Sequence, residues 1–429
     1  MRRATTLGAL LLAAATITGC GALGSAQDDP SGPSKRLGQS SGKDDRATSG
    51  PSSPTTDPDA PSGWGPTLGE LAQARSSVEA MSLEQRVATV LMPGFWGYDG
   101  QEPSSAEAAQ NQLMYGMDSP TEVVRAHGFG GFFLRPEVIG DADQVSRLAG
   151  QLHDAGDGPD GLPLLLSIDQ EGGVVQRLKE GVDVVPSAAA VGASADPSYA
   201  RKVARQNGRT LLDLGLTMVL APVADVDPDG VSVIGSRAYS SDVDHAGEMV
   251  AATVEGYLGA GIVPVVKHFP GLGTVEGDSH RSLPVQPKTV AQLLRTDLVP
   301  FRSAIDAGAP VVMSAHVAVS ELEQDMPASL SSAVLDGLLR DELGFDGVVI
   351  TDSQGMGPIH GRYGPAEGAV RSLLAGNDLV LNSFRPDKAR RAVIRAVESG
   401  RLGEDRVAEA ATRVQALRIY QQRIAPAGG

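Results

Sequence analysis

The feature that most limits the fold is a series of eight short apolar segments, each separated from the next by enough residues for a helix. Several segments are apolar almost throughout, as is typical of parallel strands buried on both faces. Helical patterns lie between them, and Ser82 with Gln85 has the spacing of a capping box. The alternation predicts an α/β protein with a parallel sheet. We expect strands at 90–95, 130–134, 162–169, 216–223, 262–268, 311–316, 347–352 and 378–382.

Eight such strands favour a single (β/α)8 barrel of the TIM type, although a doubly wound open sheet would show the same alternation. In a barrel, the residues that follow the strands converge on the C-terminal face, where barrel enzymes carry their catalytic groups. In an open sheet, only those near the switch point would meet. Polar or ionisable residues stand where the apolar segments end, namely Asp169, Asp225, Lys267, His268, His316, Asp352 and Asn382.

The first 19 residues are expected to be the signal peptide of a lipoprotein. Arg2 and Arg3 precede a mostly apolar run, 7–17, that is too short to span a bilayer. The run ends in Ile17-Thr18-Gly19-Cys20, which resembles the lipobox of bacterial lipoproteins. This resemblance implies cleavage before Cys20 and lipidation of its sulfur. An ordinary secreted protein with an unpaired cysteine is the alternative.

The segment 20–63 is expected to be a disordered tether. Ser, Gly, Pro and Asp dominate it, and Leu23 and Leu37 are its only large aliphatic residues, so it cannot bury enough apolar surface to fold. We therefore divide the chain into a signal peptide (1–19), Cys20 with the tether (20–63), a catalytic barrel (64–425) and a tail (426–429).

Charge and cysteine content exclude several classes of protein. The net charge of −16, from 36 Lys and Arg against 52 Asp and Glu, argues against nucleic acid as a partner, because phosphate backbones require a basic face. The single cysteine excludes a disulfide within the chain and any zinc site built from several thiolates.

The third predicted strand ends in residue types that suit a polyhydroxylated ligand. It reads Ser167-Ile168-Asp169-Gln170-Glu171-Gly172-Gly173, and Arg177 follows. Carboxylate and guanidinium groups together offer acceptors and donors to hydroxyl groups. An internal salt bridge that shapes the turn is the alternative for Glu171 and for Asp169.

The fifth predicted strand leads into a loop with an acid–histidine pair. Lys267-His268-Phe269-Pro270-Gly271 is followed by a glycine-rich stretch that ends in Asp278-Ser279-His280. An aspartate two residues from a histidine can hydrogen-bond one ring nitrogen, which fixes the tautomer and makes the other nitrogen a better base. Metal ligation by His268, Asp278 and His280 is a competing interpretation, and a purely structural loop is another.

The seventh predicted strand ends in one carboxylate, Asp352, which could be a nucleophile, a ligand-binding acid or a helix cap.

Together, the three strand-end segments resemble family 3 glycoside hydrolases, specifically the β-N-acetylglucosaminidase, or β-hexosaminidase, branch. The match also includes Ile234-Gly235-Ser236-Arg237 and Gly344-Phe345-Asp346-Gly347, and its segments run in order from about residue 83 to residue 417.

The resemblance implies a role for each matching residue. Asp352 attacks the anomeric carbon, His280 acts first as acid and then as base, and Asp278 orients His280. The sugar hydroxyls are contacted by Asp169, Arg177, Arg237, Lys267 and His268. The chemistry needs neither a cofactor nor a metal. His316 also matches a family segment, and we expect it to form the wall of the site or to support it from behind.

The chain departs from the family pattern at three places. Leu272 stands where relatives often have a second histidine, and Ser236 stands where an acidic residue is common. Ser353 follows Asp352, whereas many relatives have an acidic residue or leucine there. The nucleophile and the dyad remain, so the departures bear on specificity for the aglycone, the part of the substrate beyond the cleaved bond.

The resemblance and the expected anchor together predict a retaining, exo-acting hydrolase that releases N-acetylglucosamine from peptidoglycan fragments. We expect an extracytoplasmic monomer that contacts the membrane only through its lipid. Phosphorolysis is a variant, because a neutral histidine repels an anionic acceptor less than a glutamate does. A non-catalytic wall-binding lipoprotein is the alternative from another class, and the intact Asp278, His280 and Asp352 argue against it.

Overall fold

The computed structural model describes residues 57–156, 161–228 and 232–426. The predicted signal peptide, Cys20 and nearly all of the tether lie outside the described residues, as does most of the predicted tail. The described residues belong to one contact unit of the chain, Pro54–Gly429. None of their helices has both the length and the apolar content that crossing a membrane requires.

The eight predicted strands are all present, and paired neighbours run parallel. Six of them form a curled sheet in the order β2-β3-β6-β7-β9-β12, and the other two, β1 and β13, pair with each other. The strands are β1 (Leu91–Met92), β2 (Gly131–Phe133), β3 (Leu165–Ile168), β6 (Met218–Val219), β7 (Val263–Phe269), β9 (Val311–Ser314), β12 (Val348–Thr351) and β13 (Val380–Leu381).

Hydrogen bonds join the β1–β13 pair to both edges of the six-stranded sheet. Beside β2, the Phe133 N–H donates to the Pro93 carbonyl at 3.0 Å, and beside β12 the Thr351 N–H donates to the Leu379 carbonyl at 3.0 Å. The fold is therefore α/β with a curled parallel sheet, as the alternation predicts. Its first and last strands are neighbours, an arrangement that the doubly wound order does not produce.

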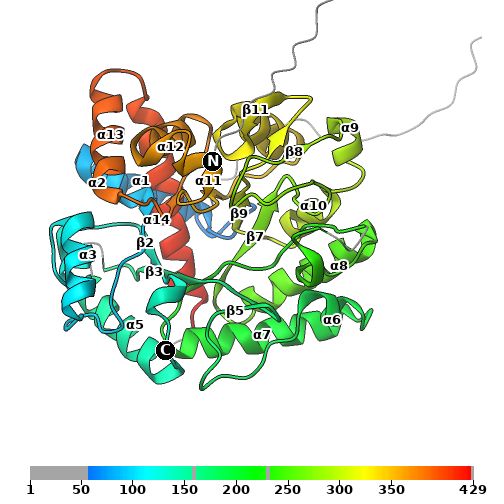
Figure 1. Cartoon of the computed structure of the whole chain (residues 1–429), viewed down its shortest axis with the longest axis horizontal. Coiled ribbons are helices and arrows are strands. Elements are labelled where there is room, and N and C mark those ends of the chain that lie inside the picture. Colours follow the sequence, from blue (N-terminus) through cyan, green and yellow to red (C-terminus); the bar gives the residue numbers. More distant parts are fainter. Residues whose placement is uncertain (1–56, 157–160, 229–231, 427–429) are drawn as a thin grey trace, which may run out of the picture. The chain divides into compact units, whose positions relative to one another are not determined.

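Helices surround the sheet, with α7 and α8 along one side and α12 and α13 along another (Figure 1). The helices of at least seven residues are α1 (Leu68–Glu79), α2 (Leu83–Thr89), α3 (Ser105–Tyr115), α4 (Pro120–His127), α5 (Ala142–Gly156), α7 (Pro197–Asp213), α8 (Val243–Leu258), α10 (Val299–Asp306), η4 (Ala333–Glu342), α12 (Gly364–Leu374), α13 (Pro386–Glu398) and α14 (Glu404–Ile424). Shorter elements are η1 (Pro136–Val138), β4 (Gln170–Gly172), β5 (Val175–Gln176), α6 (Ala188–Gly192), η2 (Gly235–Arg237), β8 (Val285–Gln286), α9 (Val290–Leu293), β10 (Ala318–Val319), β11 (Glu323–Pro327), η3 (Ala328–Leu330) and α11 (Gly357–His360).

Local sequence explains where several helices begin and how the strands are buried. The predicted capping box is confirmed at α2, where the Gln85 N–H donates to Ser82 Oγ at 3.4 Å and the Ser82 N–H to Gln85 Oε1 at 2.8 Å. Along β9, Met313 packs into one cluster inside the sheet, whereas its neighbour Val312 packs against the helices. Both faces of the strand are thus apolar, which is why the segment reads as a continuous apolar run.

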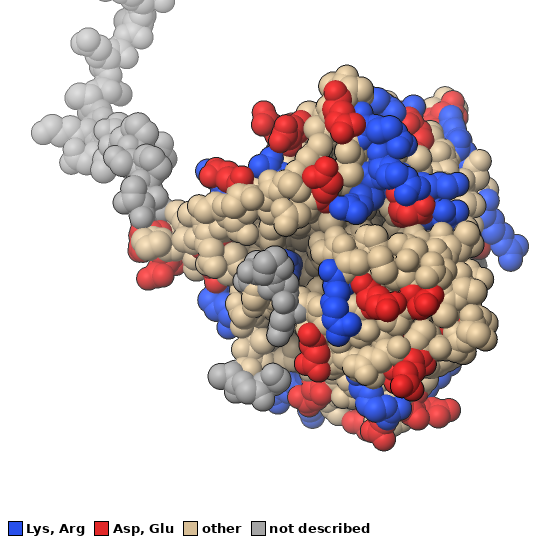
Figure 2. Space-filling view, turned by 90° about the vertical axis from the view of Figure 1, so that its left-hand side faces the viewer, with Lys and Arg blue, Asp and Glu red and all other residues tan. Residues whose placement is uncertain are grey.

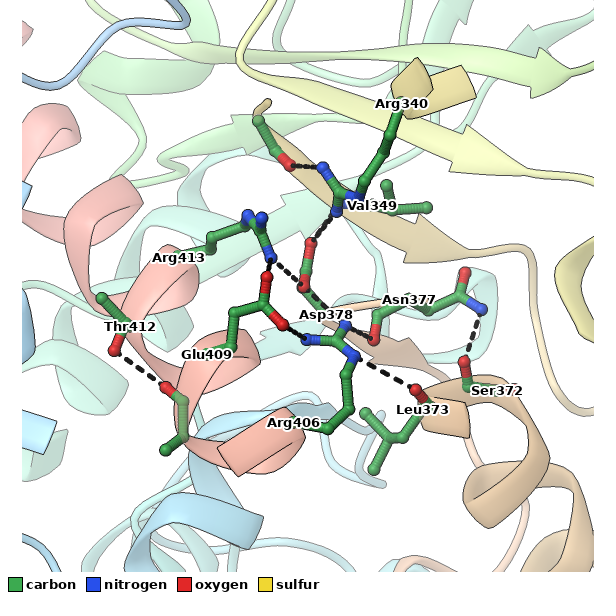
Figure 3. Close-up of polar contacts among 12 residues, drawn as sticks. Arg340, Val349, Ser372, Leu373, Asn377, Asp378, Arg406, Glu409, Thr412 and Arg413 are labelled. Carbon is green, nitrogen blue, oxygen red and sulfur yellow. Dashed lines mark hydrogen bonds and ion pairs between the residues drawn. The ribbon is translucent and has the colours of Figure 1, made fainter. Parts of the chain in front are cut away.

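A buried carboxylate just before β13 ties the sheet to two helices (Figure 3). Asp378 accepts from Arg340 of η4 at 2.8 Å and from Arg406 and Arg413 of α14 at 2.8 and 3.3 Å. It also accepts from the Val349 N–H at 3.0 Å. Burial alone would raise the pKa of the Asp378 carboxyl, but the three arginines and the Val349 N–H hold this pKa below its usual range.

Replacing Asp378 by asparagine is expected to lower the free energy of unfolding by about 3–5 kcal/mol, because three arginines would then face a neutral amide. Since the folded pKa is lowered, the carboxylate stabilises the fold fully above its unfolded pKa of about 3.9, and this stabilisation is lost at more acid pH. Urea unfolding at neutral and acid pH measures both effects. The matched change Glu404→Gln removes an exposed partner of Arg86 and should cost less than about 1 kcal/mol. Equal urea midpoints for Asp378→Asn and the unmodified chain would contradict the expectation.

Candidate active site

One cavity of about 370 Å³ contains the predicted site residues in its lining. Its walls come from the C-terminal ends of the strands, from the β4–β5 hairpin and from two loops, which is where a parallel barrel-like sheet gathers strand-end side chains. Cys20 lies outside the described residues. The lining includes Asp169, Arg177, Arg237, Lys267, His268, Asp278, His280 and Asp352, which are all eight predicted catalytic and sugar-contacting residues.

Glu171 of β4 holds two of the predicted sugar contacts in place. Its carboxylate accepts from Arg237 Nε at 2.7 Å and Nη2 at 2.8 Å, and it pairs with Lys267 Nζ at 2.6 Å. Lys267 also donates to Asp169 at 2.8 Å. Burial would raise the pKa of Glu171, but Lys267 and Arg237 lower it to about 2. Of the two interpretations of Glu171, the geometry matches the internal ion pair.

His268 is oriented by a carboxylate to which the sequence assigned no role. Asp225, after β6, lies 2.6 Å from His268 Nδ1, and its other oxygen accepts from the Leu272 N–H at 2.7 Å. These partners make Nδ1 the donor and leave Nε2 to accept from Arg237, 3.4 Å away. The position of Asp225 at the end of a predicted strand was the only sequence signal for it. The side chain of Leu272, a departure from the family pattern, lines the cavity.

Asp352 lies directly after β12, and backbone groups fix its position. Its N–H donates to the Ser314 carbonyl at 2.9 Å, and its carboxylate accepts from the Ser353 N–H at 2.7 Å. Burial alone would raise the pKa of the Asp352 carboxyl, but the Ser353 N–H and the Lys267 cation help to hold this pKa below its usual range. Because Lys267 stays protonated at neutral pH, Asp352 is a carboxylate there.

His316 supports the segment that carries Asp352. It is fully buried, with Nδ1 2.8 Å from Ser329 Oγ and Nε2 3.0 Å from the Ser353 carbonyl. The ring therefore donates through Nε2 to the carbonyl next to Asp352 and accepts through Nδ1. Burial lowers the pKa of His316, which favours this neutral form. Its place behind the cavity wall matches the supporting position that the sequence predicted.

Asp278 and His280 form the predicted pair, with Asp278 half-buried and His280 exposed. Asp278 Oδ1 lies 2.8 Å from His280 Nδ1 and accepts from the His280 N–H at 2.9 Å. These two hydrogen bonds lower the pKa of Asp278. The His280 side chain is 71% exposed. The loop is held to α11, since the Gly357 N–H donates to the His280 carbonyl at 3.1 Å and a Cβ at Gly357 would lie 3.0 Å from that oxygen.

Within the ranges that the structure describes, no group of three or more His, Cys, Asp and Glu residues is arranged to hold a metal ion. His268 is engaged with Asp225, whereas His280 is engaged with Asp278. The three residues of the metal interpretation therefore do not form a ligand set.

Replacing Glu171 by glutamine is expected to lower kcat/KM for a small glycoside about 100-fold, mainly through KM. The amide cannot neutralise both Lys267 and Arg237, so neither side chain keeps its position in the cavity. Steady-state kinetics with Glu171→Gln and Glu171→Asp measure the effect, and the aspartate should restore part of it. Glu180→Gln, an exposed carboxylate outside the cavity lining, is the matched control. Unchanged kinetics in Glu171→Gln would show that the ion pairs do not position the site.

Comparison with known proteins identifies the family to which the chain is similar. The family model for the glycosyl hydrolase family 3 N terminal domain matches residues 83–417. The curated "Beta-hexosaminidase" of Thiobacillus denitrificans is 36% identical over 266 residues, which cover 61% of this chain and 73% of that protein. "Beta-hexosaminidase LpqI" of Mycobacterium tuberculosis is 38% identical over 254 residues, which cover 57% of this chain and 64% of that protein.

The chain is also similar to solved structures of family 3 glycoside hydrolases. The chain is similar to a glycoside hydrolase family 3 β-N-acetylglucosaminidase from Paenibacillus sp. str. FPU-7, with 38% identity and a TM-score of 0.74. That match covers 82% of this chain and 64% of the other. A family 3 glycosyl hydrolase from Mycobacterium smegmatis is 32% identical with a TM-score of 0.68, and the match covers 79% of this chain and 98% of that one.

Proposed function

Because the chain belongs to glycosyl hydrolase family 3 and is a glycoside hydrolase of the β-N-acetylhexosaminidase kind, we propose that it is a retaining exo-β-N-acetylglucosaminidase acting on peptidoglycan fragments. The observation that supports this most is the shared cavity of Asp352 and the Asp278–His280 pair. The proposal treats the sheet as a complete (β/α)8 barrel, with the β1–β13 pair as its closing strands.

In this mechanism, the Asp352 carboxylate attacks the anomeric carbon as the bond to the leaving oxygen breaks. His280 gives its proton to that oxygen, and a glycosyl–Asp352 ester forms. Water then attacks the anomeric carbon, His280 takes the proton of the water, and the ester bond to Asp352 breaks. Asp278 accepts from Nδ1 at 2.8 Å, which keeps Nε2 available for both proton transfers and stabilises the imidazolium.

The cationic side of the cavity would bind the sugar. Lys267 and Arg237, held by Glu171, present fixed donors to hydroxyl and amide oxygens. Arg177 is exposed at the cavity and has no ion pair with any residue that the structure describes, so its guanidinium is free for the substrate. Fixed donors of this kind need no reorganisation as charge develops in the transition state.

Outside the described residues, the lipobox-like Ile17-Thr18-Gly19-Cys20 supports a lipid-anchored, extracytoplasmic enzyme. An anchor there would keep the catalytic unit beside the cell wall, where β-linked N-acetylglucosamine is abundant. The proposal takes the enzyme as a monomer, as we expect from the sequence.

The test is incubation of the purified chain with a panel of β-linked nitrophenyl sugars, with and without inorganic phosphate. We expect the fastest release from the N-acetylglucosaminide, at the same rate in both conditions, with free N-acetylglucosamine as product. Sugar 1-phosphate as product would make the chain a phosphorylase. Absence of release from every sugar would favour the non-catalytic wall-binding protein.

A further inference from the structure

One face of the molecule does not share the acidic character of the chain. The segment 385–401 carries six Lys and Arg against two Asp and Glu, whereas the whole chain has a net charge of −16. Figure 2 shows Lys and Arg gathered at the upper right of the face that lies on the left in Figure 1, the side on which α13 lies. The segment that contains α13 is therefore locally basic within an acidic chain.

The exposed cations of α13 form a stripe along the helix. Lys388, Arg391 and Arg395 are exposed and spaced i, i+3 and i+7, which places them on one side of the helix. Neighbouring like charges at these spacings repel each other by about 0.2–0.5 kcal/mol. Asp387 is the partner of both Arg385 and Arg391, and Lys388 and Arg395 have no ion pair with a described residue. The stripe thus keeps uncompensated positive charge.

An aromatic side chain stands at the end of this stripe nearest the catalytic cavity. Phe384 is 55% exposed, and its ring centroid lies 5.0 Å from that of His360. Phe384 lies three residues after Leu381, which lines the cavity. We call Phe384, Lys388, Arg391 and Arg395 the docking surface.

We propose that the docking surface binds the anionic headgroups of a phospholipid bilayer. An aromatic ring beside aligned cations matches the bilayer interface, where rings lie at headgroup depth and Lys or Arg side chains meet lipid phosphates. The stripe is on the outer side of a helix and lines neither the catalytic cavity nor the groove beside α7. An extended planar partner fits such a surface better than a single glycan strand.

The charges are sufficient for a weak attachment. Each Lys or Arg near an anionic leaflet contributes about 1 kcal/mol, so Lys388 and Arg395 supply about 2 kcal/mol. Arg391 adds less, because Asp387 is already its partner. The Debye length is about 8 Å at physiological ionic strength, so acidic side chains on other faces do not cancel this attraction. Such a contact becomes effective once a tether raises the local concentration. The inference goes beyond the expectation of a lipid anchor as sole membrane contact, and it does not depend on the proposed glycosidase activity.

The experiment uses the chain from residue 20 onward with Cys20→Ser, so that neither signal peptide nor lipid contributes. It is sedimented with phosphatidylcholine vesicles that either contain or lack phosphatidylglycerol, at low and high salt. We expect binding only to the anionic vesicles, weakened by salt. The triple variant Lys388→Glu/Arg391→Glu/Arg395→Glu should lower the partition coefficient by at least about 100-fold, because each substitution removes an attractive charge and adds a carboxylate that the anionic leaflet repels.

The control is Lys202→Glu/Arg205→Glu/Arg209→Glu on α7, which has the same spacing, exposure and change in charge. It should keep vesicle binding, and both variants should keep the thermal unfolding midpoint of the parent chain, which reports an intact fold. Equal loss of binding in the control, or no binding of the parent chain to anionic vesicles, would overturn the proposal. If the parent chain bound purified wall glycan but not vesicles, the docking surface would be assigned to an anionic glycan instead.

Discussion

Replacing Asp352 by asparagine is expected to lower turnover of a β-N-acetylglucosaminide by at least about 10⁴-fold, equivalent to ~5–6 kcal/mol of barrier. The amide has nearly the shape of the carboxylate but cannot attack the anomeric carbon. The Ser353 N–H and the cation at Lys267 keep the native carboxyl ionised, so the substitution removes a charge that the site is built to hold. Initial rates of nitrophenol release measure the loss.

Asp341→Asn is the matched control, because it removes an exposed carboxylate from η4, away from the cavity. It should leave the rate unchanged, and thermal unfolding should show that both variants are folded. Turnover by Asp352→Asn within a few-fold of the unmodified chain would remove Asp352 as nucleophile.

Replacing His280 by alanine is expected to have an effect that depends on the leaving group. Without a proton donor, departure of a poor leaving group such as a second sugar should slow by about 10²–10⁴-fold. A dinitrophenolate leaves without protonation, so formation of the glycosyl-enzyme from the dinitrophenyl sugar should change little. Because His280 is an exposed side chain, the substitution should not disturb the fold.

Pre-steady-state kinetics with both substrates separate the two steps. The dinitrophenyl sugar should give a burst of phenolate followed by slow turnover, because His280 is also the base for the second step. Asp278→Asn should show a weaker form of the same pattern, since the ring remains but its orientation and basicity change. An equal loss with both leaving groups would argue against acid–base catalysis by His280.

The sequence predicted the strands well because burial on both faces leaves a continuous apolar run, as in β9. Strand lengths were harder to predict. The predicted strand at 90–95 contains a paired segment of only Leu91–Met92, since the pairing with β13 is limited to two residues on each strand. Apolar character reports burial, and burial extends beyond the hydrogen-bonded ladder.

The site residues also fall into those that the sequence predicted and those whose roles it did not predict. Groups at strand ends or in compact motifs, such as Asp352 and the Asp278–His280 pair, were found because their signal is local. Glu171 and Asp225 were not given their positioning roles, because these depend on partners such as Arg237, which is distant in sequence. Asp378 shows the limit most clearly, since its arginine partners come from η4 and α14. Local pattern does not encode ion pairs between elements that only tertiary packing brings together.

The pairing of Leu91 with Val380 has a consequence for biosynthesis. Translation proceeds at about 5–20 residues per second, so the nascent chain spends tens of seconds with its first strand made and that strand's partner still missing. The native sheet cannot be completed during that time, and pairing distant in sequence is intrinsically slow to form. The sheet therefore closes only when about the last fifty residues of the chain are being made.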